Sequence, residues 1–91
     1  MKKAVKVKIK GTVQGVFFRA FVKEKADRMN VTGYVRNLED GRVEAFFEGS
    51  VDSVNAMIEI CRRGPAHSKI ESIEVIDERY QGMKDFRILR I

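Results

Sequence analysis

The chain has 91 residues, of which 44% are hydrophobic and 34% are charged, so we expect a single small domain over residues 1–91. No apolar run approaches the ~18 residues of a transmembrane helix, and the N-terminus lacks the apolar stretch of a secretory signal. We therefore expect a cytoplasmic protein with no membrane partner. The formal net charge of +5 admits nucleic acid, an anionic surface or a small anionic substrate, and does not choose among them.

A strand followed by a helix is predicted for the first third of the chain. Apolar side chains near the N-terminus alternate with lysines, as in a strand with one buried and one solvated face: Val5, Val7 and Ile9. After residues 11–19, apolar residues recur at helical spacing: Val22, Ala26 and Met29. This spacing predicts a helix over about residues 19–29, with Asn30 as its left-handed terminator.

Four further strands complete the predicted sheet. Residues 31–38 and 42–49 are predicted to form a hairpin, because Glu39-Asp40-Gly41 between them carries the Asp-Gly signal of a tight turn. Residues 70–80 and 86–91 are predicted as the last two strands.

A second helix is predicted between the hairpin and the final strands. Ser50 is a suitable N-cap, and Asp52 falls in the first turn, where the helix dipole favours an acid. The apolar stripe of this helix consists of Val51, Val54, Met57, Ile58 and Cys61. Gly64-Pro65 ends it.

The order of these elements is βαββαβ plus a short terminal strand. Two interleaved βαβ units in one sheet predict an α+β, ferredoxin-like sandwich: an antiparallel sheet with both helices on one face. This fold supports many functions, so the function has to be argued from particular residues.

The first candidate site is the segment that joins the first strand to the first helix, residues 11–19 (GTVQGVFFR). A glycine-bearing turn at a helix start gathers unpaired backbone N–H groups, and Arg19 adds a planar guanidinium at the same point. This arrangement suits a phosphate-sized anion. Taken alone, the segment is equally compatible with an ordinary strand-to-helix loop in which Arg19 is solvated.

The second candidate is Asn37, near the end of a predicted strand in which asparagine is unfavourable. It either starts the turn or serves a site, since the first helix returns the second strand to the neighbourhood of the first. Asn37 then approaches the end of the segment before the helix. Its side chain has no titratable proton, so it can orient a water molecule but cannot deprotonate one.

Both segments resemble the acylphosphatase family. Residues 11–19 are similar to the family's signature segment, and residues 33–43 (GYVRNLEDGRV), reaching on to Gly49, are similar to its second signature. The resemblance implies an enzyme that hydrolyses acyl phosphates to a carboxylate and inorganic phosphate, and a monomer suits a chain of this size and polar surface. Phosphate is then both product and inhibitor, and no metal or other cofactor is needed.

The resemblance also implies a division of roles. Arg19 takes the phosphate-binding role, and Asn37 takes the role of positioning the attacking water. Backbone N–H groups that cradle the phosphoryl oxygens come from Gly15, Val16, Phe17 and Phe18.

Two other classes remain as alternatives: a non-catalytic anion-binding domain of the same fold, and an RNA-binding RRM-like module. An RRM stacks bases on aromatic residues of its central strands. Here the first strand presents lysines, and Phe46 of the third is flanked by Glu44 and Glu48, which repel a nucleic-acid backbone. We therefore expect no nucleic-acid partner. The single cysteine, Cys61, is expected to be a buried packing thiol and His67 an exposed loop residue.

Overall fold

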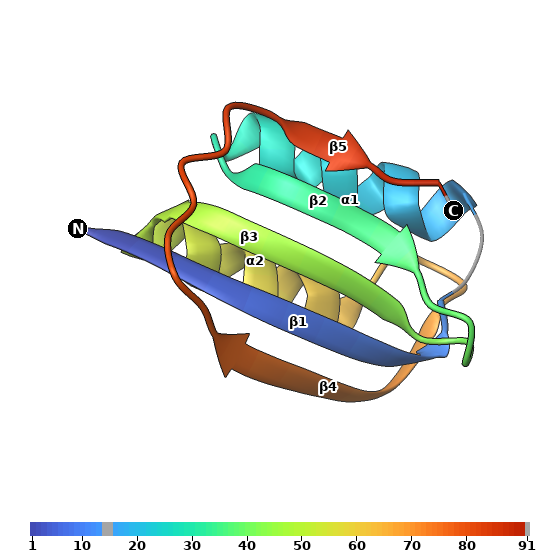
Figure 1. The fold of residues 1–91 in the computed structure, drawn as a ribbon. Helices are drawn as coiled ribbons and strands as arrows, with labels where there is room; N and C mark the ends of the chain where they lie inside the picture. Colours follow the sequence, from blue (N-terminus) through green and yellow to red (C-terminus); the bar gives the residue numbers. More distant parts are fainter. Residues whose placement is uncertain (14–15, 91) are drawn as a thin grey trace.

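The computed structural model describes residues 1–13 and 16–90, which form a five-stranded sheet with both helices on one face (Figure 1). In chain order the elements are β1 Lys2–Thr12, α1 Val16–Arg28, β2 Thr32–Asn37, β3 Val43–Ser50, α2 Val51–Arg63, β4 Lys69–Asp77 and β5 Phe86–Ile88. The order of strands in the sheet is β4-β1-β3-β2-β5. The predicted ferredoxin-like fold is confirmed.

The first four strands pair antiparallel, and β5 adds to the edge beside β2 in the parallel direction, so the complete sheet is mixed. Because β1 and β2 both run antiparallel to β3, they run parallel to each other and end at the same edge of the sheet (Figure 1). Their last residues, Thr12 and Asn37, therefore lie at one end of the molecule. The expected approach of the second strand to the first is realised with β3 between them.

The core fills the space between the sheet and the helices, and the predicted apolar faces are the buried ones. In β1 the alternating side chains are 0% exposed: Val5, Val7 and Ile9. In α2 the buried stripe is Val54, Met57, Ile58 and Cys61. The periodicities of two and of 3.6 residues thus identify the faces that pack together.

Several boundaries differ from those predicted. α1 begins at Val16, not near residue 19, because Phe18 extends the buried stripe of Val22 and Ala26 by one turn toward the N-terminus. The predicted strand over residues 70–80 ends at Asp77, and the one over residues 86–91 ends at Ile88.

The predicted helix caps Asn30, Ser50 and Gly64 are confirmed. Asn30 has a φ of 58° after α1, and Gly64 has a φ of 70° as the C-cap of α2. The Ser50 side chain accepts a hydrogen bond from the backbone N–H of Ser53 at 3.2 Å, which makes it the N-cap of α2. No helix among the described residues has the length and apolar character needed to cross a membrane.

The face of the sheet opposite the helices is crossed by residues 78–85, which connect β4 to β5 (Figure 1). The carboxylate of Glu48, which is 0% exposed, accepts hydrogen bonds from the backbone N–H of Gln81 at 2.6 Å and of Met83. Phe46 is only 1% exposed and its ring stacks on that of Tyr34, with centroids 5.7 Å apart. Phe46 is therefore not available to stack on a base.

Candidate active site

Arg19 lies in the first turn of α1, at the end of the sheet where β1 and β2 finish. Its Nη1 donates a hydrogen bond to the backbone carbonyl of Leu89 at 3.4 Å. Its Nε is buried and has no hydrogen-bond partner among the described residues. One edge of the guanidinium is thus held by the chain, while a buried donor has no acceptor in the described part of the chain.

Asn37 is the last residue of β2 and pairs with Val43 of β3. Successive side chains of a strand alternate between faces, so Asn37 shares the helix-facing side of β2 with the buried Val35. Its Oδ1 is buried and, within the described part of the chain, accepts no hydrogen bond. This asparagine, of a residue type that is unfavourable in a strand, thus carries an unsatisfied acceptor.

Arg19 and Asn37 line the same hollow, together with Leu89 and Arg90, in a volume of about 380 Å³. The two predicted side chains are therefore brought together. Leu89 and Arg90 follow β5 and were missed by sequence reasoning, because no pattern in the chain indicated that the C-terminal strand adds next to β2. The basic character of Arg90 in the last residues was the one available signal.

Three of the four residues expected to supply backbone donors lie in the first turn of α1: Val16, Phe17 and Phe18. The fourth, Gly15, lies outside the described residues. The first N–H groups of an α-helix have no acceptor within the helix, and the first turn of α1 contains no acidic side chain that could take them. The start of α1 therefore favours an anion, and Arg19 sits beside it.

Gly11 allows β1 to approach β4 closely just before the site. It lies at a register shift of β1 against β4, with a φ of 148°, and an added Cβ would stand 2.0 Å from the carbonyl oxygen of Lys69. No other residue fits this close approach without displacing the backbone. The glycine at the start of the first signature thus positions β1 against β4, one residue before the strand ends.

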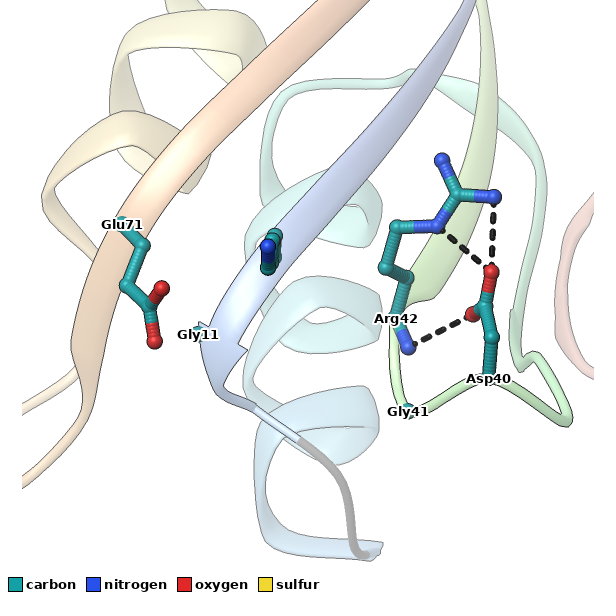
Figure 2. Close-up of a pocket in the computed structure, with 6 residues that line it drawn as sticks. Gly11, Asp40, Gly41, Arg42 and Glu71 are labelled. Atoms are coloured by element: carbon teal, nitrogen blue, oxygen red, sulfur yellow. Dashed lines mark hydrogen bonds and ion pairs between the residues drawn. The ribbon is translucent and has the colours of Figure 1, made fainter.

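A larger hollow, of about 490 Å³, lies at the end of β1, between the β2–β3 turn and Glu71 of β4 (Figure 2). Its walls combine cations with carboxylates. Arg42 is bonded to Asp40, with Nε and Nη2 at 2.9 and 2.8 Å from Oδ2, and this guanidinium holds the pKa of the Asp40 carboxyl below its ordinary value. Because these charges already neutralise each other, this hollow offers less to an anion than the one at Arg19.

The other candidates for chemistry do not join the site. Cys61 is fully buried in α2, and this burial raises the pKa of its thiol to about 12, as expected for a packing residue rather than a nucleophile. His67 is exposed in the loop before β4, as predicted. Within residues 1–13 and 16–90, no three His, Cys, Asp or Glu side chains gather in a way that could hold a metal ion.

Comparisons with known proteins point to one family. A model of the acylphosphatase family matches residues 5–88. The chain is 54% identical over 90 residues to an acylphosphatase of Syntrophus aciditrophicus, covering 98% of this chain and 94% of that one. Among solved structures, it is similar to an acylphosphatase from Bacillus subtilis, with a TM-score of 0.91, 35% identity and coverage of 99% and 100% of the two chains. An acylphosphatase from Coxiella burnetii matches with the same TM-score of 0.91, 33% identity and coverage of 97% and 93%.

Proposed function

The chain belongs to the acylphosphatase family and hydrolyses acyl phosphates, and we propose that Arg19 binds the phosphoryl group while Asn37 orients the attacking water. In this proposal the backbone N–H groups of Gly15, Val16, Phe17 and Phe18 complete the phosphate cradle. The products are a carboxylate and inorganic phosphate, and phosphate competes with substrate for the same donors.

The observation that supports this division of roles is that two residues lining one hollow each carry a buried, unpartnered atom among the described residues: a donor, Arg19 Nε, and an acceptor, Asn37 Oδ1. The oxygens of a phosphoryl dianion only accept hydrogen bonds, so they match Arg19 and cannot satisfy Asn37 Oδ1. A water molecule donates hydrogen bonds, so it matches Asn37. Substrate and nucleophile therefore complement different atoms of the same site.

The chemistry of the substrate suits these residues. A carboxylate is a good leaving group, so no general acid has to protonate it as the P–O bond breaks. Phosphoryl transfer depends mainly on in-line positioning and on stabilising charge on the equatorial oxygens, which a guanidinium and backbone donors provide. Asn37 does not titrate, so the proton of the attacking water passes to a phosphate oxygen of the substrate or to solvent.

The same proposal extends to the conditions in which the enzyme works. The donors of Arg19 and of the first turn of α1 supply the charge stabilisation, and turnover then needs neither a metal ion nor an organic cofactor. We further propose that the protein acts as a cytoplasmic, single-domain monomer with no nucleic-acid partner, in keeping with a chain of 91 residues of which 34% are charged.

The test is release of inorganic phosphate from benzoyl phosphate, together with inhibition by added phosphate. Arg19→Ala is expected to lower kcat/KM by roughly 10³-fold and to abolish phosphate inhibition, because it removes the fixed charge of the cradle. Asn37→Ala is expected to lower kcat by roughly 10²-fold and to leave phosphate inhibition nearly unchanged, because it misplaces only the water.

Two surface variants serve as matched controls. Arg28→Ala removes an arginine of α1 that pairs with Glu24 at 3.7 Å, and Asn55→Ala removes an asparagine of α2 that accepts from Lys3 Nζ at 2.9 Å. Both should retain wild-type kinetics. A fully active Arg19→Ala enzyme would overturn the phosphate assignment, and an Asn37→Ala enzyme that loses phosphate affinity but keeps its kcat would reverse the two roles.

A further inference from the structure

The start of α1 lies between two hollows of different character. One is the polar hollow of Arg19 and Asn37, beside β2 and β5. The other is lined by Thr12 at the end of β1, by Phe17 in the first turn of α1, and by Pro65, Ala66 and His67 before β4. In the sheet order β4-β1-β3-β2-β5, β3 separates the strands of the first hollow from those of the second.

We infer that the second hollow binds the acyl group of the substrate and that the Phe17 side chain selects for large, aromatic acyl groups. This inference rests on the function proposed above. It assigns a place to the organic half of the substrate, whereas Arg19 and Asn37 account only for the phosphoryl half and the water.

The direction of attack determines on which side of the phosphoryl group the acyl group lies. In an in-line displacement the water enters opposite the leaving group. Asn37 holds the water on the β2 side of the phosphoryl group, so the carboxylate leaves on the opposite side. That side is where β1 ends and residues 65–68 run toward β4, since Thr12 pairs with Lys69. The hollow beside Phe17 therefore lies where the mechanism sends the acyl group.

Phe17 exposes its ring to solvent, where a ligand can contact it. Its side chain is 76% exposed, whereas the adjacent Phe18 is 3% exposed and packs in the core. A ligand group that covers this ring removes its apolar area from water, which is favourable. Because its N–H belongs to the first turn of α1 while its side chain lines the second hollow, Phe17 is placed to contact both halves of one substrate.

The size of the hollow limits what it accepts. It has a volume of about 160 Å³ and is lined mainly by carbon atoms, with Val13 and Phe18 forming its buried floor. An acetyl group fills little of such a space and touches few of its walls. A benzoyl ring fills more of it and stacks or packs edge-on against Phe17.

The experiment compares kcat/KM for benzoyl phosphate with kcat/KM for acetyl phosphate, both followed by phosphate release. Both leaving groups are carboxylates, so the ratio of the two values reports acyl binding more than chemistry. Phe17→Ala is expected to lower the benzoyl-to-acetyl ratio by about tenfold, and Phe17→Leu by about threefold. Ala66→Leu, which fills the exposed side of the hollow, should lower the same ratio without touching the helix.

Tyr80→Ala is the control, because Tyr80 is a 49% exposed aromatic residue that does not line either hollow. Its ratio should equal that of the wild type. Inhibition by inorganic phosphate, which has no acyl group, should stay within about twofold in every variant.

An unchanged ratio in both Phe17→Ala and Ala66→Leu would overturn the inference and would leave the acyl group in solvent. A Phe17→Ala enzyme that loses phosphate inhibition would also overturn it, because the side chain would then act through the cradle. The proposed function fails in a different way, namely if Arg19→Ala retains turnover and phosphate inhibition.

Discussion

The two helices of this protein have the same length, 13 residues, and pack on the same face of the sheet, yet they begin in opposite ways (Figure 1). α2 provides its own cap: Ser50 accepts the N–H of Ser53, and Asp52 adds a negative charge in the first turn. α1 has no acid in its first turn and carries the cation Arg19 there. One helix start is satisfied by its own cap and acid, whereas the first turn of the other contains a cation and no acid.

This contrast concerns the charge of the side chain in the first turn, which decides whether a helix start favours binding of an anion. A cation in a first turn opposes the helix dipole and costs about 0.3–1 kcal/mol, whereas the two arginines in the last turn of α2, Arg62 and Arg63, follow the dipole. Arg19 is thus unfavourable for α1 in isolation. A phosphate bound beside Arg19 would make the net electrostatic energy at this helix start favourable, because the anion interacts favourably with both the dipole and the guanidinium.

The difference between the two helix starts can be removed by placing an acid in the first turn of α1, as Asp52 is placed in α2. Phe17→Asp places a carboxylate in the exposed first turn of α1, where it takes free N–H groups and repels phosphate. We expect the inhibition constant for phosphate to rise by about tenfold, from the Coulomb term of neighbouring charges near a protein surface. Phosphate inhibition of benzoyl phosphate turnover at low ionic strength is the measurement.

Phe17→Asn is the matched control, since it has the same size as aspartate and no charge. The difference between the two variants should shrink as salt screens the charge. Equal inhibition constants in the Asp and Asn variants at low salt would show that the start of α1 does not bind the anion.

The sequence predicts the fold well because the features that determine it are local. The period-two pattern of β1, the Asp-Gly turn and the caps Ser50, Asn30 and Gly64 each act within a few residues, and all are confirmed. The start of α1 was predicted too late, because Phe18 belongs to the apolar stripe but precedes Val22 by a full turn, and the turn between them includes the charged Arg19. A stripe that begins with one residue is hard to distinguish from a loop that packs into the core.

The site is predicted only in part, for a physical reason. Arg19 and Asn37 stand out within their own segments, one beside a helix start and the other at a strand end. The carbonyl of Leu89, which holds the Arg19 guanidinium, reaches it across 70 positions through the parallel pairing of β5 with β2. Every residue carries a backbone carbonyl, so no residue type signals which one is used. Such contacts appear only once the topology is known.

Removing the N-cap of α2 tests how much this helix depends on a cap supplied by the chain. Ser50→Ala deletes the oxygen that accepts the Ser53 N–H, and we expect the free energy of unfolding to fall by about 1 kcal/mol. Urea unfolding measures it. Ser53→Ala is the control, because it removes a hydroxyl from the same turn and keeps the N–H. Both variants should retain wild-type kcat/KM, and a Ser50→Ala enzyme with full stability would remove the evidence that α2 depends on its own cap.

The smallest expected effect isolates the charge at the start of α2. Asp52→Asn keeps the side-chain size and removes the negative charge, so we expect a loss of about 0.5 kcal/mol of stability at low ionic strength that fades in high salt. Asp77→Asn is the control, because it makes the same carboxylate-to-amide change at an exposed residue of β4, outside both helices. If Asp52→Asn is as stable as the wild type at low salt, the dipole contributes nothing measurable at α2, and hydrogen bonding by Ser50 alone distinguishes its start from that of α1.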